Sequence, residues 1–371
     1  MKYLRQYGIL LLLVLIPIGI ALRWLAPGQH SLIFFAAVLA IVPLAAQMGQ
    51  ATEVLADRLG GGIGGLLNAT FGNAAELIIG ALALRAGLVD LVKASLTGSI
   101  ISNVLLVFGG AAIVGGIRHS IQRFNHTAAA LGTTMLFLSA IGLIVPAVFH
   151  WLARMSERQP PDLQLDTAIA VVLFLTYCVS LLFKLKTHRQ LYGPTPEAEA
   201  EEEPSTTDDA AMPTAKDVRK AIVKLLLATV GVVVMSELLV DEVTEAARAL
   251  GMSELFIGVV IVALVGNAAE HYSAISMAAK NRMDAAAAIA VGSSQQIALF
   301  VAPLLVFLSY FIGPHPMDLL FSTFEVIAIV LAVLTIVLIA HDGETNWMEG
   351  VQLLAVYLIL VFGFYFLPAP K

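Results

Sequence analysis

Charged side chains are scarce in this chain. They account for 13% of its 371 residues, against about a quarter in ordinary soluble domains, which argues against a soluble globular protein. A single cysteine, Cys178, excludes an internal disulfide and a zinc site built from cysteines. Hydrophobic residues make up 59% of the chain and recur in runs of the roughly 20 residues that cross a bilayer. The composition therefore predicts a polytopic membrane protein whose partner is the lipid bilayer, with no nucleic acid among its partners.

The hydropathy pattern predicts an all-α membrane protein of about eleven transmembrane helices. The first apolar run begins after a short basic segment and ends at Arg23 and Trp24 without a small-residue cleavage site. We therefore interpret it as a retained first helix and not as a signal peptide. The predicted helices cover residues 7–25, 31–56, 62–84, 90–116, 126–149, 163–185, 218–246, 254–279, 284–312, 318–340 and 347–367.

The distribution of basic residues predicts the orientation in the membrane. Placing the N-terminus in the cytoplasm puts about two thirds of the Lys and Arg residues on the cytoplasmic side, as the positive-inside rule requires. Eleven helices then leave the C-terminus outside. The short loops favour a bacterial cytoplasmic membrane as the location.

One polar stretch divides the chain. Residues 187–217 contain a run of glutamates over 197–203 and four prolines, which is typical of a solvated linker. A calcium-sensing role for this acidic run stays open. The predicted organisation is an N-terminal extra helix (1–30), a first five-helix half (31–186), the acidic cytoplasmic linker (187–217) and a second five-helix half (218–371).

The two halves contain a repeated motif. GNAAEL at residues 72–77 and GNAAEH at 266–271 share their first five residues, and the same shift of 194 positions aligns Gly98 and Ser99 with Gly292 and Ser293. The motifs fall on predicted helices three and eight, which cross the membrane in opposite directions because their places in the chain differ by five, an odd number. The pattern predicts two inverted-topology repeats, a common construction of secondary transporters, with the binding site near the bilayer midplane.

Each motif places a glutamate, Glu76 or Glu270, inside an otherwise apolar helix. A carboxylate at the centre of a transmembrane helix costs at least about 2.5–3.5 kcal/mol. Inverted symmetry brings the two glutamates to face each other. Two facing carboxylates cannot both stay ionised without a bound ion. They must hold protons or a cation, which is the property of an exchanger site.

The residues around the glutamates favour a hard cation. Calcium takes six to eight oxygen ligands from carboxylates, carbonyls and waters, and no cysteine accompanies the acids. Glycines would loosen each helix so that carbonyls turn toward the ion, and asparagines would add oxygens; packing of the glycines and interhelical hydrogen bonds of the asparagines remain alternatives. Polar side chains on predicted helices four and nine would line a wet pathway, or else make ordinary helix contacts. The residues in question are Gly72, Gly266, Asn73 and Asn267 at the motifs, and Ser99, Ser102, Ser293 and Gln296 on the flanking helices.

These motifs resemble the two alpha-repeats of the cation/calcium exchanger superfamily. GNxxEH, the stretch MGQATE, the stretch MSELLV and the acidic linker are similar to the calcium/proton antiporters, the CAX family. The resemblance covers predicted helices two to eleven, and it implies a transient calcium site at Glu76 and Glu270. It departs from the symmetric pattern where Ser102 faces Gln296.

The resemblance also implies a pathway for protons and ions. It assigns that pathway to Gln50, Glu53 and Glu237, while His271 follows the antiporter branch. A surface role for the two glutamates, and a satisfied core position for His271, are the alternatives.

The function predicted is a secondary active transporter that exchanges cytoplasmic calcium for protons by alternating access. Its substrates are calcium and protons; no cofactor and no enzymatic activity are expected, and a homo-oligomer is possible. A sodium-coupled or manganese-selective exchanger is the first alternative. A passive channel or an intramembrane enzyme fits less well, because the two glutamates are not a protease motif.

Overall fold

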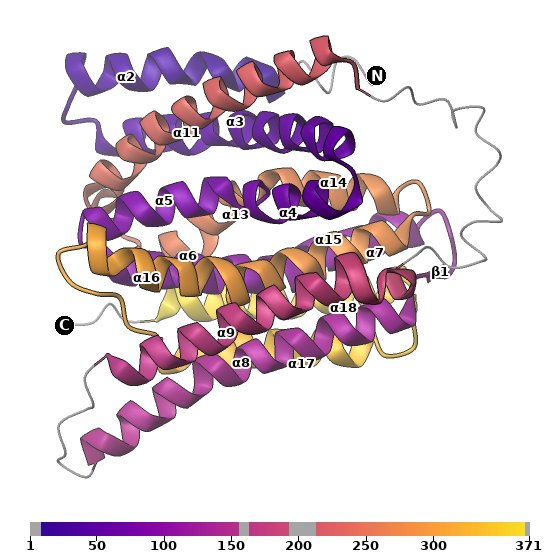
Figure 1. The fold of residues 1–371 in the computed structure, drawn as a ribbon. Helices are drawn as coiled ribbons and strands as arrows, with labels where there is room; N and C mark the ends of the chain where they lie inside the picture. The colour runs from indigo at the N-terminus through magenta and orange to yellow at the C-terminus, as the bar shows by residue number, and fades with distance from the viewer. Residues whose placement is uncertain (1–8, 156–162, 193–212, 368–371) are drawn as a thin grey trace.

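The computed structural model describes residues 9–155, 163–192 and 213–367 of the chain (Figure 1). The elements before the linker are η1 (Leu12–Val14), α2 (Leu15–Leu25), α3 (His30–Leu59), α4 (Gly61–Phe71), α5 (Ala74–Arg85), α6 (Val89–Ile101), η2 (Ser102–Val107), α7 (Phe108–Gly116), β1 (Gln122–Arg123), α8 (His126–Met155), α9 (Gln164–Leu182), η3 (Phe183–Thr187) and η4 (Arg189–Tyr192). Those after it are α11 (Ala215–Leu250), α12 (Glu254–Phe256), η5 (Ile257–Val262), α13 (Ala263–Gly266), α14 (Ala268–Ala278), α15 (Met283–Gln296), η6 (Ile297–Val301), α16 (Ala302–Ile312), α17 (Thr323–Ile339), β2 (Glu344–Thr345) and α18 (Trp347–Phe366).

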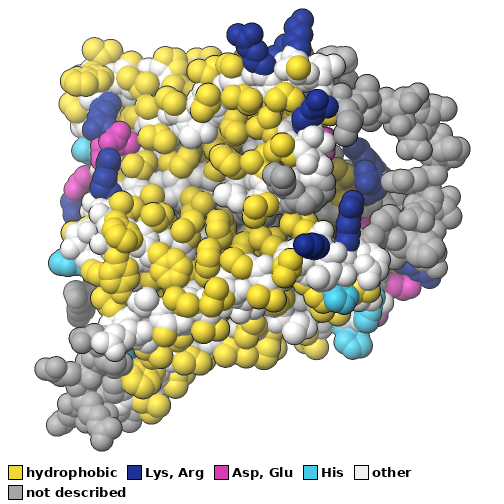
Figure 2. Space-filling model, in the orientation of Figure 1, with side chains coloured by type: hydrophobic (Ala, Val, Ile, Leu, Met, Phe, Trp, Pro, Cys, Tyr) yellow, Lys and Arg dark blue, Asp and Glu magenta, His cyan; other side chains and the backbone are white. Residues whose placement is uncertain are grey.

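The prediction of a largely helical membrane protein is confirmed. Among the described residues, seven helices are long and apolar enough to cross a bilayer, or eight if the bent pair around Asn267 counts as one. Ile9–Leu25 and Thr323–Ile339 are shorter apolar helices, so the count of eleven stays a prediction. Figure 2 shows a broad hydrophobic surface bounded at both ends by charged side chains, as a bilayer requires.

Two details differ from the sequence prediction. A short antiparallel pair joins β1 to β2, with Gln122 opposite Thr345 and Arg123 opposite Glu344, so the fold is not purely helical. The tenth predicted helix begins at Thr323 instead of residue 318, because Ser322 and Glu325 form a capping box there. The acidic run over 197–203 lies outside the described residues.

Both repeated motifs interrupt their helices. The helix containing α4 and α5 breaks at Gly72 and Asn73, and the one containing α13 and α14 bends by 60° at Asn267. Asn73 and Asn267 have nearly equal backbone angles, φ −103° and ψ 21° against φ −94° and ψ 13°. A glycine followed by an asparagine weakens a helix at that point, because glycine gains conformational freedom and asparagine has a low helix propensity.

The broken helices lie in the middle of the molecule. In Figure 1, α2, α3 and α11 lie above them and α8, α9 and α17 lie below. Helix α6 packs closely against η5: a Cβ at Gly98 would overlap the carbonyl of Val259, and one at Gly258 would lie 2.6 Å from the Cβ of Ala94. Both glycines are therefore needed for this close approach.

Candidate ion-binding site

Each motif glutamate lies in the first turn of a half-helix. Glu76 is the third residue of α5, and Glu270 is the third residue of α14. The positive end of the helix dipole, with its free N–H groups, lies beside a carboxylate at that position and stabilises negative charge there. The break in each helix therefore creates an electrostatic reason for an acid in the apolar interior.

The Glu76 carboxylate is buried without a polar partner. Its side chain is 6% exposed, and neither of its oxygens has a hydrogen-bond partner among the described residues. The Oε2 atom of Glu270 is buried in the same way. Burying a carboxylate without compensation is costly, so the pair requires bound protons or a cation.

The structure brings the two motifs together. A Cβ built on Gly266 would lie 3.2 Å from both Cγ and Oε1 of Glu76, so the first glutamate lies against the second motif. Glycine at position 266 leaves room for the Glu76 side chain beside the buried backbone of the α13–α14 break.

The two asparagines join the helix breaks to the neighbouring helices. The Nδ2 of Asn267 donates to the Oγ of Ser99 at 2.8 Å, and its Oδ1 accepts from the Nδ2 of Asn103 at 3.0 Å. The Nδ2 of Asn73 donates to the Oε1 of Gln296 at 2.5 Å. Asn103 was missed by the sequence analysis, although it is one turn after Ser99 on the same face of the helix.

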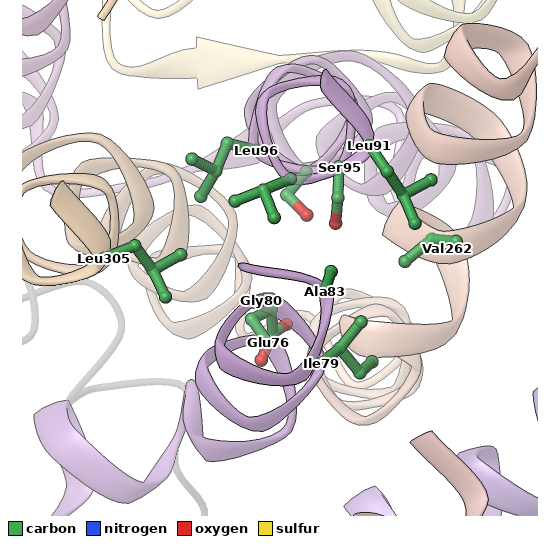
Figure 3. Close-up of a pocket in the computed structure, with 11 residues that line it drawn as sticks. Glu76, Ile79, Gly80, Ala83, Leu91, Ser95, Leu96, Val262 and Leu305 are labelled. Atoms are coloured by element: carbon green, nitrogen blue, oxygen red, sulfur yellow. The ribbon is translucent and has the colours of Figure 1, made fainter. Parts of the chain in front are cut away.

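A small cavity reaches Glu76 from one side. Its volume is about 10 Å³, the space of about one water molecule. Figure 3 shows the side chain of Ser95 directed into the space between α6 and the helix that carries Glu76. Ser95 was also missed by the sequence analysis, because nothing in its local sequence distinguishes it from an ordinary helix serine. The cavity is lined by Glu76, Ile79, Gly80, Ala83, Leu91, Val92, Ser95, Leu96, Ser99, Val262 and Leu305.

The other predicted polar residues near the breaks are buried. Ser102 is 0% exposed and its hydroxyl donates to the Ser99 carbonyl at 3.3 Å. Ser293 is buried on α15. The Nε2 of His271 is buried with no hydrogen-bond partner among the described residues, beside Glu270 in the sequence.

Three predicted pathway residues lie on the surface instead. Gln50 is exposed and its Oε1 accepts from the Nζ of Lys224 at 2.8 Å. Glu53 is exposed on the last turns of α3. Glu237 is 49% exposed and pairs with Arg85 at 2.9 Å. The structure does not bring these three side chains into the buried cluster of Glu76.

The donor set around the breaks contains few charges. Within the described ranges, no group of three or more His, Cys, Asp or Glu side chains is placed to hold a metal ion. The available oxygens are those of two carboxylates, two asparagine amides, serine hydroxyls and the backbone at the breaks. Hard cations that accept neutral oxygen ligands fit such a set, whereas a permanently bound soft metal does not.

Comparisons with known proteins give a consistent result. The sequence model of a family described as sodium/calcium exchanger protein matches residues 30–186 and 220–366. A Ca(2+)/H(+) antiporter of Synechocystis sp. is 44% identical over 365 residues, which cover 97% of both chains. The Ca(2+)/H(+) antiporter ChaA of Bacillus subtilis is 44% identical over 358 residues, covering 95% of this chain and 98% of that one.

Solved structures share the fold. The structure of native YfkE superposes with a TM-score of 0.80 at 40% identity, covering 97% of this chain and all of that one (100%). The crystal structure of the H+/Ca2+ exchanger CAX has a TM-score of 0.71 at 16% identity over 97% of this chain and 91% of that one, a similarity of fold alone.

Proposed function

Because the chain belongs to the calcium/proton antiporter branch of the sodium/calcium exchanger family, we propose that it exchanges calcium for protons across a membrane. The observation that carries this proposal is the pair of glutamates at two helix breaks, Glu76 buried and Glu270 half-buried, with three of their carboxylate oxygens buried and lacking partners in the described part of the chain. Two such carboxylates bind either one divalent cation or protons, and this competition couples the two flows.

In the proposed mechanism, Glu76 and Glu270 bind calcium together with neutral oxygens. Asn73 holds one interrupted backbone against α15 and Asn267 holds the other against α6, and backbone oxygens at the breaks would turn toward the ion. Gly72 and Gly266 permit the breaks. When calcium leaves, protons bind the carboxylates and keep the empty site neutral, which makes the return step possible.

An asymmetry between the halves supports alternating access. Gly98 on α6 is in contact with the backbone of Val259 on η5, whereas no atom of the described residues lies within 4 Å of a Cβ built at its repeat counterpart, Gly292 on α15. One end of the site is therefore closed by a tight helix contact, and the described residues make no equivalent contact at Gly292. Exchange between these two arrangements would expose the site to each side in turn.

The proposed topology has two inverted halves, 31–186 and 218–371, connected by the linker 187–217 and preceded by one extra helix. The match of one family model to 30–186 and again to 220–366 supports this division. With the N-terminus in the cytoplasm, the contact of Gly98 closes the outer end of the site. A bacterial cytoplasmic membrane is the proposed location, in keeping with the two bacterial antiporters to which the chain is similar.

Transport in proteoliposomes tests the proposal. An imposed pH gradient should drive calcium uptake by the wild-type protein, and E76Q or E270Q should abolish it, because glutamine keeps the shape but cannot exchange a proton for a cation. E254Q is a matched control, since Glu254 lies at the start of α12 outside the buried pair. Full exchange by E76Q or E270Q would contradict a shared site.

A sodium-coupled or manganese-selective exchanger remains the second candidate, since members of the superfamily differ in their ions. Calcium movement that persists with sodium after the proton gradient is dissipated would favour sodium coupling. Transport of manganese in place of calcium, with both ions at equal concentration, would favour a manganese-selective exchanger. Flux that never drives calcium uphill would indicate a channel.

A further inference from the structure

A groove of about 670 Å³ lies between α2, α3 and the first turns of α11, outside the ion-binding site. Its floor is apolar and includes Leu13, Ile16, Leu44 and Leu227. In Figure 2, Lys and Arg side chains gather over the start of α11, next to the hydrophobic surface of α2 and α3. The groove therefore combines a strip for hydrocarbon with a basic rim.

The basic rim comes from one face of a helix. Lys216, Arg219, Lys220 and Lys224 all line the groove, and their spacing of three, four and eight residues places them on the same side of α11. Asp217 lies between them in the sequence, but its carboxylate is bound in the capping box of Thr214. No Asp or Glu lines the groove among the described residues, so its described lining has four basic side chains and no acidic one, with Asp217 beside Lys220 outside the lining.

The position of the rim matches the headgroup region of a bilayer. Helix α11 has 36 residues, a length of about 54 Å at 1.5 Å per residue, which exceeds the roughly 30 Å hydrocarbon core. The first turns of α11 therefore project into the polar region. Lys224 lies deepest, half-buried, and donates to Gln50, as a lysine does when its stem follows apolar surface and its ammonium stays in a polar layer.

We propose that this groove binds one anionic phospholipid, with its phosphate among Arg219, Lys220 and Lys224 and an acyl chain along the apolar floor. Clustered basic residues next to a transmembrane helix attract anionic lipids, with each contributing a small, additive share of the affinity. The apolar floor distinguishes a lipid from free phosphate, because inorganic phosphate has no group to bury there. The lipid would connect the N-terminal helix α2 to the two helices that pack beside the candidate ion site.

Native mass spectrometry of the full-length protein in a neutral detergent tests this site. Phosphatidylglycerol should be retained in preference to phosphatidylcholine with the same acyl chains. R219Q/K220Q should weaken phosphatidylglycerol retention roughly tenfold or more, since two charges near the surface are lost. K186Q/R189Q is the matched control: it removes two exposed basic residues at the same end of the bundle, and it should leave retention unchanged.

Competition identifies the bound species. Inorganic phosphate at the lipid concentration should not displace phosphatidylglycerol; displacement would indicate an anion site without an acyl strip and would overturn the proposal. Equal loss of retention in the control would also overturn it, by showing general attraction to a basic surface. Unchanged retention of phosphatidylglycerol in R219Q/K220Q would overturn the proposal as well. Displacement of bound phosphatidylglycerol by a synthetic peptide of residues 197–203, but not by excess lipid, would also overturn it, because the occupant would then be an acidic peptide segment.

Discussion

The tight contact between α6 and η5 gives a test of alternating access. A Cβ at Gly98 would lie 2.5 Å from the carbonyl carbon of Val259 and 2.6 Å from its Cα. Ordinary carbon contacts begin near 3.5 Å, so Gly98→Ala must separate the two helices by about 1 Å. Both sides of the contact are backbone, which has no rotamer to adjust. Overpacking of this kind costs about 1–3 kcal/mol.

This cost falls on one conformation. It applies where α6 and η5 are in contact, and not where they have moved apart, so the mutation should shift the balance between the two states by about 5-fold to 150-fold. The assay is labelling of S95C with a membrane-impermeant thiol reagent in a C178S background, because Ser95 lines the cavity on this side of Glu76. Labelling from outside should become at least severalfold faster in Gly98→Ala.

The repeat counterpart should behave differently. Gly292→Ala meets no described atom within 4 Å, so the folded protein should keep its stability or gain up to about 1 kcal/mol from a better helix former. Transport should nevertheless fall, because the other state would bring position 292 against α4 as Gly98 is now brought against η5. S95C labelling should not increase in this variant.

Controls separate these effects from misfolding. Gly28→Ala adds a methyl group where no described atom lies within 4 Å, and it should change neither labelling nor transport. If Gly98→Ala does not fold, Gly258→Ala gives a milder version, because the nearest obstacle is the Cβ of Ala94. A folded Gly98→Ala protein with normal labelling and normal transport would refute the reasoning.

Two further substitutions test the framework of the site. Asn267→Ala removes the buried bonds to Ser99 and Asn103 and should lower stability by about 1–2 kcal/mol, given typical interhelical bonds in membranes; a thermal melt in detergent with an unchanged midpoint would argue against it. Lys93→Met leaves Asp318 and the Leu320 carbonyl without their shared donor and should cost about 1–3 kcal/mol. Its melt is compared with that of Lys186→Met, an exposed lysine that should show no loss.

The sequence predicted the parts of the molecule that depend on local pattern. The helical segments follow from hydropathy, and the membership of the antiporter family, expected from the repeated GNAAE motif, is confirmed. The interruptions at Asn73 and Asn267 also follow from local chemistry, since glycine and asparagine disfavour a continuous helix. The repetition of one motif in the chain was therefore enough to select Glu76 and Glu270 as candidate site residues.

Tertiary partners were beyond such reasoning. Gln50 carries no local sign that Lys224, far along the chain, donates to it, and Glu237 carries none that Arg85 pairs with it. Ser95 on α6 and Asn103 on η2 lie at the candidate site only because this helix crosses beside the broken helices. The π-helical segments η2 and η6 also escaped prediction, since one additional residue per turn is decided by packing and not by hydropathy.

Residues that correspond between the two halves in sequence do not all make corresponding contacts. Ser294 donates to the carbonyl of Ile100 at 3.3 Å, and these two residues are repeat counterparts, 194 positions apart. In the proposed two-fold arrangement, a residue contacts its own counterpart only near the symmetry axis, so this bond would place the crossing of α6 and α15 near that axis. Away from that point Gly98 is packed against η5, whereas a Cβ at Gly292 meets no described neighbour within 4 Å. This inequality is what the proposed alternating access requires: a second arrangement would exchange the two glycine contacts, with the crossing of α6 and α15 as the part that need not move.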